Sequence, residues 1–551
     1  MRFKWIFLLT FAVIFSAQAQ KRTKTNKTAD LPRPKLVVGL VVDQMRWDYL
    51  YRFYDRYQDN GFKRLLNEGF TCENTNLDYL PTVTAIGHST VYTGSVPALH
   101  GIAGNDFIIQ ATGKTMYCTA DASVETVGST SAAGKMSPRN LLSSTITDEL
   151  ELATNFRSKV IGVALKDRGS ILPAGHAADA AYWFDDASGN WITSTWYMKE
   201  LPAWVQQFND KKLAQKYLKQ DWKTLYPAKT YAQSSADDNR YEGAFKGSDG
   251  PVFPIRTSEL FRTDGVGIIR STPYGNTFTL DMAKAALENE KLGQSGMTDF
   301  LAVSLSSPDY IGHRFGPNAL EVEDMYLRLD QDLADFLSAL DKQVGKGNYT
   351  LFLTADHGAS NNPNFLIDNK LPGGFWQSGA TLKALNTFLE SKYHAPKLVL
   401  SLSNYQVSLN NTLIAANKLE ESAIRKDCVA FLEKQEGVAY AVDIKDAGTA
   451  SIPEVLRSRM IKGHNPERSG VIQLFLKPGW YSGSPNATGT SHGTWSPQDS
   501  HIPLVWMGWG IQQGHTARPT NMSDIAPTLA ALLRIQAPSG AIGTPILEVL
   551  K

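Results

Sequence analysis

Four continuous apolar segments constrain the fold of this chain more strongly than any other feature. They are rich in Val, Leu and Phe and span residues 35–42, 160–165, 300–305 and 349–355. Such segments are typical of strands buried on both faces of a parallel sheet. Helical patterns lie between them, as in residues 318–341, where leucines recur at helical spacing. Strands that alternate with helices predict an α/β fold, with a doubly wound, mostly parallel sheet flanked by helices.

An ionisable residue follows each of these segments. Asp43, Lys166 and Asp356 come directly after the first, second and fourth segments, and the third leads to Asp309. Open α/β sheets form their sites beyond the carboxyl ends of the strands. One such residue could be an ordinary loop charge, but four of them predict a functional site at this edge of the sheet.

Two long regions interrupt the alternation of strands and helices. They cover about residues 170–265 and 365–489, and the second contains helical patterns at 382–391 and 413–434. We expect a single catalytic domain over residues 35–551, with these regions as insertions that form caps or lobes near the site. The first insertion is rich in Trp, and most of these indoles could equally serve packing alone.

The first 34 residues read as a targeting segment followed by a linker. Arg2 and Lys4 precede an apolar run too short to span a bilayer and the small-x-small motif Ala17-Gln18-Ala19, which predicts a signal peptide over residues 1–19. Residues 20–34 are polar and predict a flexible leader. No later segment approaches the length of a membrane span, so we expect a periplasmic or secreted protein without a membrane anchor.

Three cysteines remain for an oxidising compartment, namely Cys72, Cys118 and Cys428. We favour a Cys72–Cys118 disulfide with one buried thiol, although the sequence leaves the other pairings open. The net charge of +1 gives no electrostatic argument for binding a nucleic acid duplex or an anionic membrane. Any anion binding must therefore be local.

The stretch from Leu77 to Gly104 contains a candidate nucleophile. An extended lead at residues 81–83 is followed by helix-compatible residues from Thr84, until Gly94 ends the pattern. Thr84 could be only the N-cap of this helix, which is the commoner role. It could also be a nucleophile at a helix N-terminus, a position suited to an anionic substrate.

Three Asp and three His residues form a candidate metal site. Asp309 and His313 are four residues apart, His357 follows Asp356, and His492 lies in the Gly/Ser/Thr-rich segment 488–494. Mixed carboxylate and imidazole ligands suit zinc, and with Asp43 the set can hold two ions by three protein ligands each. Each pair alone is weak evidence, but all six at predicted strand ends and loops indicate a dinuclear site.

These residues resemble the metal and nucleophile pattern of the alkaline phosphatase superfamily. The resemblance extends to the final helical segment at residues 523–533. The segments Lys166-Asp167-Arg168 and Gly104-Asn105-Asp106 are similar to those of the PafA-type, phosphate-irrepressible alkaline phosphatases, which are secreted bacterial phosphomonoesterases.

The resemblance implies a role for each residue. One zinc would be bound by Asp309, His313 and His492, and the second by Asp43, Asp356, His357 and Thr84. Asn105, Lys166 and Arg168 would contact the phosphoryl group, although a surface ion pair with Asp167 is an alternative for the two cations. Thr84 would attack phosphorus and form a phosphothreonine, and the substrates would be small phosphate monoesters, hydrolysed by a monomer.

Several alternatives remain. A phosphodiesterase or nucleotide pyrophosphatase shares the six ligands, the Thr and the Asn, but two cations at residues 166 and 168 favour a dianionic monoester. A sulfatase would carry C/S-x-P-x-R where this chain has Thr84-Ala-Ile-Gly-His88. An inactive zinc-binding relative or a periplasmic binding protein would not need a complete nucleophile and six ligands.

Overall fold

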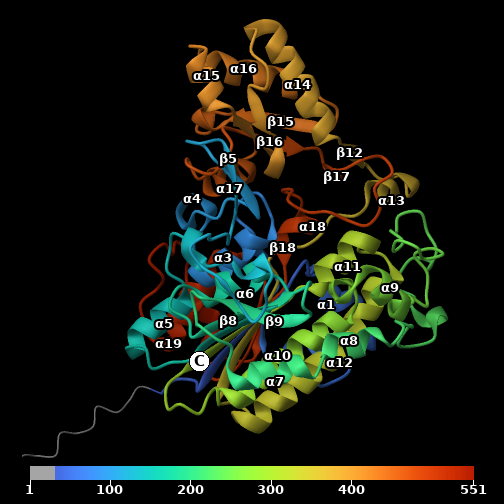
Figure 1. Cartoon of the computed structure of the whole chain (residues 1–551), viewed down its shortest axis with the longest axis vertical. Coiled ribbons are helices and arrows are strands. Elements are labelled where there is room, and N and C mark those ends of the chain that lie inside the picture. The colour runs from blue at the N-terminus through green and yellow to red at the C-terminus, as the bar shows by residue number, and fades with distance from the viewer. Residues whose placement is uncertain (1–31) are drawn as a thin grey trace, which may run out of the picture. The chain divides into compact units, whose positions relative to one another are not determined.

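A ten-stranded sheet forms the centre of the computed structural model, which describes residues 32–551 (Figure 1). The strand order is β20-β2-β19-β11-β1-β10-β7-β8-β9-β6. The five strands from β11 to β8 are parallel, and β19, β2, β9 and β6 add antiparallel pairs on either side. The strands are β1 (Leu36–Val42), β2 (Phe70–Cys72), β6 (Thr126–Val127), β7 (Val160–Ala164), β8 (Ala180–Asp185), β9 (Asn190–Ser194), β10 (Asp299–Leu305), β11 (Tyr349–Thr354), β19 (Leu504–Gly508) and β20 (Gly514–Thr516).

The four apolar segments of the sequence become β1, β7, β10 and β11, which are neighbours in this sheet. Every residue of these four strands is buried, as expected for strands covered on both faces. The predicted doubly wound, mostly parallel α/β fold is therefore confirmed. Because the four strands are parallel, their carboxyl ends meet at one edge of the sheet.

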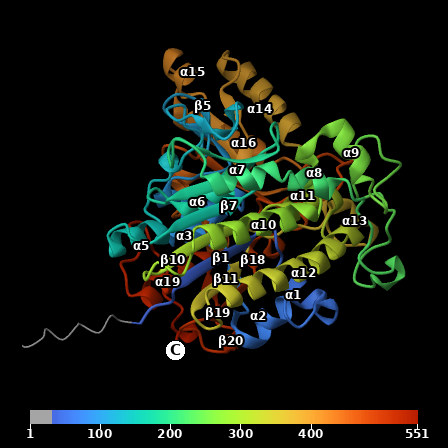
Figure 2. The same ribbon diagram turned by 60° about the horizontal axis from the view of Figure 1, so that its bottom comes forward.

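Two groups of helices flank the sheet, and the helices of each group contact one another (Figure 2). One group contains α3, α5, α6 and α19, and the other contains α2, α10 and α12. The helix predicted at residues 318–341 is α12, so that prediction is confirmed. The bounds are α2 (Phe62–Glu68), α3 (Thr84–Thr93), α5 (Ile146–Thr154), α6 (Asp167–Ala174), α10 (Tyr274–Asn289), α12 (Leu320–Gln343) and α19 (Ile525–Leu533).

A second sheet with its own hydrophobic core lies within residues 374–482, in the upper part of Figure 1. Its strand order is β13-β14-β16-β15, and α14 and α16 pack on it. The parallel strands β12 (Gly374–Trp376) and β17 (Trp480–Ser482) bring the two ends of this lobe side by side. The lobe contains β13 (Val399–Ser401), β14 (Gln406–Leu409), β15 (Val438–Asp443), β16 (Ile472–Leu476), α14 (Ser378–Tyr393), α15 (Asn411–Ala416), α16 (Glu421–Leu432) and α17 (Glu454–Gly463).

The region expected as a first insertion, residues 170–265, begins within α6. It supplies β8 and β9 to the central sheet before it continues through α7 (Ala203–Asp210), α8 (Leu213–Leu218) and α9 (Thr257–Asp264). Trp183, Trp191 and Trp222 are at most 2% exposed, so these three indoles serve packing. Trp196 is 37% exposed.

The expected disulfide is wrong. Cys72, Cys118 and Cys428 are all free and buried. Cys72 ends β2 near one end of the central sheet, whereas Cys118 follows the separate hairpin of β4 (Asp106–Ile109) and β5 (Lys114–Tyr117), so strand pairing does not bring the two together. Burial raises the pKa of the Cys72 thiol to about 12 and that of Cys428 to about 12, which keeps both thiols protonated.

The predicted signal peptide at residues 1–19 and most of the predicted leader at residues 20–34 lie outside the described residues. Within residues 32–551, the structure contains no helix with the length and apolar character that a bilayer crossing requires.

Candidate active site

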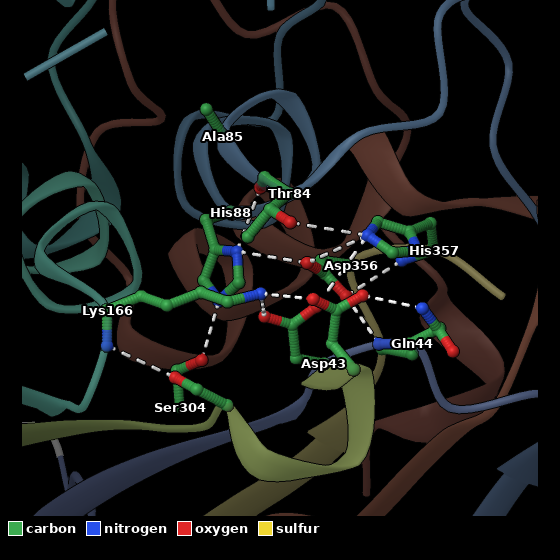
Figure 3. Close-up of polar contacts among 12 residues, drawn as sticks. Asp43, Gln44, Thr84, Ala85, His88, Lys166, Ser304, Asp356 and His357 are labelled. Carbon is green, nitrogen blue, oxygen red and sulfur yellow. Dashed lines mark hydrogen bonds and ion pairs between the residues drawn. The ribbon is translucent and has the colours of Figure 1, made fainter. Parts of the chain in front are cut away.

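The carboxyl ends of the four central strands gather the predicted site residues. Asp43 follows β1, Lys166 follows β7 and Asp356 follows β11. Asp309 lies two residues into α11 (Ser307–Phe315), the helix that follows β10. Figure 3 shows Asp43, Lys166 and Asp356 turned toward one another, with Thr84 beside them.

Thr84 is the first residue of α3, and its side chain does not cap the helix. The N-cap position belongs to Val83, which has an extended backbone. The Thr84 Oγ instead lies 3.4 Å from His357 Nε2, and only 1% of the residue is exposed (Figure 3). The interpretation of Thr84 as an ordinary N-cap is therefore wrong.

Three histidines share one arrangement that suits metal binding. In His313, His357 and His492, Nδ1 lies 2.7–2.9 Å from a main-chain oxygen, of Thr490, Gly358 and Thr82 respectively. If Nδ1 donates to that carbonyl, each Nε2 carries a lone pair, which is the usual orientation of a metal-ligating imidazole. The Nε2 atoms lie 3.1–3.6 Å from Asp309 or Asp43 oxygens.

Lys166 connects the carboxylates of the two predicted metal groups. Its Nζ lies 2.6 Å from Asp43 Oδ2 and 2.6 Å from Asp309 Oδ2. Burial raises the pKa of Asp43 well above its ordinary value, and the charge of Asp356 adds to this effect. Burial acts the same way on Asp309, but His313 and Lys166 outweigh it and hold the pKa of that carboxyl well below its ordinary value.

Two sets of ligand atoms are close enough to share an ion. One consists of Asp43, Asp356 and His357, as predicted for the second zinc. The other consists of Asp309, His357 and His492, so its third member is His357 rather than the predicted His313. His313 Nε2 nevertheless lies 3.1 Å from Asp309 Oδ1.

Of the predicted phosphoryl-binding residues, Asn105 contacts the N-terminus of α3, and Arg168 lies in the first turn of α6. Asn105 Oδ1 accepts a hydrogen bond from the Ala85 amide at 2.9 Å. The Nδ2 group of Asn105 can then donate a hydrogen bond to an anion. The Arg168 Nη1 donates to the Tyr117 hydroxyl at 3.1 Å, and that hydroxyl donates to Asp167 at 2.8 Å. Tyr117 thus orients Arg168, and no direct Arg168–Asp167 ion pair is found in residues 32–551.

Sequence reasoning missed two residues in this site. Gln44 donates from its main-chain amide to Asp356 and from its side chain to Asp309, and its φ of 67° is rare for a residue with a side chain. His88 lies one turn into α3, with Nδ1 2.9 Å from the Thr84 oxygen and Nε2 2.8 Å from the Ser304 hydroxyl (Figure 3). The position of Gln44 directly after Asp43, and the four-residue spacing of His88 from Thr84, were the available signals.

Known proteins resemble this chain over nearly its full length. A sequence profile of the family described as type I phosphodiesterase / nucleotide pyrophosphatase matches residues 37–498. A Myroides odoratus protein named calcium-transporting ATPase is 60% identical, over 95% of each chain. Alkaline phosphatase PhoV of Synechococcus elongatus is 52% identical, over 98% of this chain and 99% of its own.

Alkaline phosphatase PafA of Elizabethkingia meningoseptica is 51% identical, over 95% of this chain and 96% of its own. A crystal structure of wild-type alkaline phosphatase PafA matches with a TM-score of 0.92 at 51% identity, over 95% of this chain and all of that chain. The chain belongs to the type I phosphodiesterase / nucleotide pyrophosphatase family of the alkaline phosphatase superfamily. Within it, the chain groups with the PafA and PhoV alkaline phosphatases, which confirms the resemblance seen in the sequence.

Proposed function

We propose that this chain is a zinc-dependent alkaline phosphatase that hydrolyses small phosphate monoesters through a phosphothreonine at Thr84. The observation that carries the proposal is the position of the Thr84 hydroxyl, at the N-terminus of α3 and 3.4 Å from His357 in a buried cluster of Asp and His side chains. The names of relatives at 51–52% identity support the monoesterase activity. We further propose that the enzyme acts as a monomer after export to the periplasm or beyond the cell.

The residues present fit two zinc ions. Asp43 Oδ1 and Asp356 Oδ2 are buried oxygens without a hydrogen-bond partner in the described part of the chain. A carboxylate oxygen in that state is costly unless a cation or proton compensates it. The six ligands would be Asp309, His313 and His492 for one ion and Asp43, Asp356 and His357 for the other. His357 lies close to the ligands of both ions, and the Thr84 hydroxyl lies beside His357.

The chain's own residues account for much of the chemistry. Thr84 Oγ, after loss of its proton, attacks phosphorus, and the bond to the leaving-group oxygen breaks as the new P–O bond forms. Water then cleaves the phosphothreonine and restores the Thr84 hydroxyl. Bound zinc would supply Lewis-acid chemistry that lowers the pKa of the hydroxyl and of water and stabilises the leaving oxygen.

Three side chains would bind the other phosphoryl oxygens, and Lys166 would do so in addition to its contacts with Asp43 and Asp309. The Asn105 amide is fixed at the start of α3, and Lys166 and Arg168 bring positive charge from the end of β7. A monoester presents three non-bridging oxygens and a diester only two, so these donors favour the monoester. The family profile keeps diester hydrolysis as a second candidate activity.

A comparison of two substrates tests the proposal. For the double variant Lys166→Ala/Arg168→Ala, we expect kcat/KM for p-nitrophenyl phosphate to fall at least ~100-fold, if each cation contributes about 1–3 kcal/mol. The loss for bis(p-nitrophenyl) phosphate should be much smaller. Acid quenching of the wild-type reaction should yield phosphothreonine at Thr84, and a chelator should abolish turnover until zinc is added back.

The matched control is Arg157→Ala/Lys159→Ala, which removes two cations before the start of β7 rather than after its end. Its two activities should stay close to wild type. Equal losses on both substrates in the Lys166/Arg168 variant, with zinc content intact, would contradict monoester selection by these cations. Full turnover of the metal-stripped enzyme would contradict the zinc mechanism.

A further inference from the structure

Asp499 contacts the segments that follow two proposed zinc ligands, His357 and His492, although it is not a proposed ligand itself. The residue is 0% exposed. Its Oδ2 accepts hydrogen bonds from the Thr494 amide at 2.8 Å and from the Thr494 hydroxyl at 2.7 Å. Its Oδ1 accepts a hydrogen bond from the Ser360 hydroxyl at 2.7 Å. Thr494 lies two residues after His492 and Ser360 three residues after His357, so this one carboxylate joins the two segments.

The Gly358 peptide links Asp499 to the imidazole of His357. The Gly358 amide donates to the main-chain oxygen of Asp499 at 2.8 Å, and the Gly358 oxygen lies 2.9 Å from His357 Nδ1. A Cβ on Gly358 would lie 2.0 Å from the Gln498 oxygen, so a residue with a side chain could not approach so closely. The orientation of the His357 ring therefore depends on a peptide that is held against Asp499.

Thr82 links the same carboxylate to the imidazole of His492. The Thr82 hydroxyl donates to the Thr494 oxygen at 3.0 Å and accepts a hydrogen bond from the Gly493 amide at 3.0 Å. The main-chain oxygen of Thr82 lies 2.7 Å from His492 Nδ1. Because Asp499 binds both the amide and the hydroxyl of Thr494, it supports the residue that orients the His492 ring.

The imidazoles of His357 and His492 also stack on each other, with ring centroids 3.6 Å apart and 16° between the ring planes. Rings in such close contact cannot move independently. We propose that Asp499 is a positioning residue that couples the two halves of the zinc site. The inference rests on the proposed function, which assigns His492 to one ion and His357 to the other. Asp499 belongs to neither group of candidate metal ligands in residues 32–551, so it acts through Thr494 and Ser360 rather than on an ion.

The zinc affinities of Asp499 variants test this coupling. Asp499→Ala leaves the three donors of Thr494 and Ser360 without their acceptor, so the segments that follow His357 and His492 should both shift. Loss of a residue that supports a metal ligand typically costs 10–100-fold in affinity, so we expect both zinc ions to bind at least ~10-fold more weakly. Competition with a chromophoric chelator measures the affinities, and metal analysis of the purified variant measures the stoichiometry.

Two further variants distinguish positioning from general support of the fold. In Asp499→Asn, the amide oxygen can still accept from Thr494, and the Ser360 hydroxyl can accept from the amide nitrogen, so both affinities should stay close to wild type. Ser360→Ala removes one donor and leaves the carboxylate bonded to Thr494, which keeps the test open if Asp499→Ala fails to fold. Because the two segments share one anchor, Ser360→Ala should weaken the binding of both ions.

Asp330→Ala is the matched control. Asp330 is also a buried Asp (2% exposed), and it accepts hydrogen bonds from the Gln58 and Phe62 amides. Its loss should lower the Tm of the metal-free protein and leave both zinc affinities unchanged. The inference is overturned if Asp499→Ala and Ser360→Ala bind two zinc ions as tightly as wild type, or if only one of the two ions is weakened. Wild-type protein that binds no zinc would overturn the proposed function and this inference with it.

Discussion

At the residue scale, Gln44 and Tyr117 hold proposed ligand and phosphoryl-binding side chains in place through hydrogen bonds to Asp309, Asp356 and Arg168. Asp43, Lys166 and Asp356 stand directly after apolar strands, a pattern visible in the sequence alone. Gln44 and Tyr117 contact residues that are far away in the sequence, and no local sequence pattern predicts such contacts. Only the folded chain reveals that Gln44 joins Asp309 to Asp356.

Gln44→Ala should weaken zinc binding. The substitution removes the donor 2.6 Å from Asp309 Oδ1 and leaves the main-chain contact to Asp356 in place. Loss of such a supporting hydrogen bond typically costs 10–100-fold in metal affinity, so we expect a decrease on the order of tenfold. Competition with a chromophoric chelator measures it, with Gln435→Ala in the distant lobe as the control, and equal affinities for the two variants would refute this role of Gln44.

At the element scale, the start of α3 is fitted closely to the end of β11. A Cβ added at Gly87 would lie against the main-chain oxygen and Cβ of Asp356, well inside van der Waals contact. Gly87 thus permits the approach of the helix that carries Thr84 to the strand end that carries Asp356. The sequence predicted the helix and the strand, but it did not predict how closely the two would approach each other.

Gly87→Ala should reduce both zinc content and monoesterase activity. Alanine favours helix by about 1 kcal/mol over glycine, so helix propensity alone would make the variant more stable. We expect the clash with Asp356 to outweigh this gain, and kcat/KM to fall by at least ~10-fold. Metal analysis and kinetics on the purified variant check this, and a fully active Gly87→Ala enzyme with higher Tm would show that the helix shifts freely.

The segment after α6 is tied to α5 by a pH-sensitive pair. His176 Nδ1 lies 2.9 Å from Asp148 Oδ2, and Asp148 also forms the capping box of α5 with Thr145. Burial lowers the pKa of His176, but the hydrogen bond and charge of Asp148 outweigh burial and raise it. For Asp148, burial raises the pKa, and the contact with His176 outweighs it and lowers the pKa.

His176→Asn should therefore cost most stability in mildly acid solution. A raised His pKa stabilises the fold below the ordinary value of about 6.5, and the contribution disappears as the pH rises through the folded-state pKa. The Asp148 contribution is present above its ordinary value of about 3.9 and is lost at lower pH. Urea unfolding of wild type and variant should differ most near pH 5 and least near pH 9; a constant difference would contradict a charged pair. His515→Asn replaces an exposed histidine of β20 and is the control for the effect of exchanging His for Asn.

At the scale of the whole molecule, the sequence predicted the layered α/β core but not how strands far apart in the chain pair. The apolar segments identified β1, β7, β10 and β11 because strands buried on both faces carry a continuous signal. β8 and β9 lie in the expected insertion because residues 170–265 are rich in Trp and show no clear alternation of strands and helices. The predicted site followed from the parallel order of the four apolar strands.

The 374–482 lobe has a hydrophobic core of its own, so it should open independently of the central sheet. Leu385→Ala removes a side chain that is 0% exposed in that core and should destabilise the lobe by about 2–5 kcal/mol. Hydrogen exchange should accelerate in β14 and β16 but not in β1 or β10, and zinc should stay bound. Faster exchange in all four strands would mean that the two cores unfold as one unit.

The position of β19 has a consequence for synthesis of the chain. This strand, Leu504–Gly508, lies between β11 and β2, so it pairs with two strands that are both made well before it, β2 at Phe70–Cys72 and β11 at Tyr349–Thr354. Until it emerges from the ribosome, one edge of β11 stays unpaired, and open edges invite pairing with other chains. A nascent chain therefore carries an aggregation-prone edge from the synthesis of β11 (Tyr349–Thr354) until β19 has been made, and we expect that protection by a chaperone is needed over that interval.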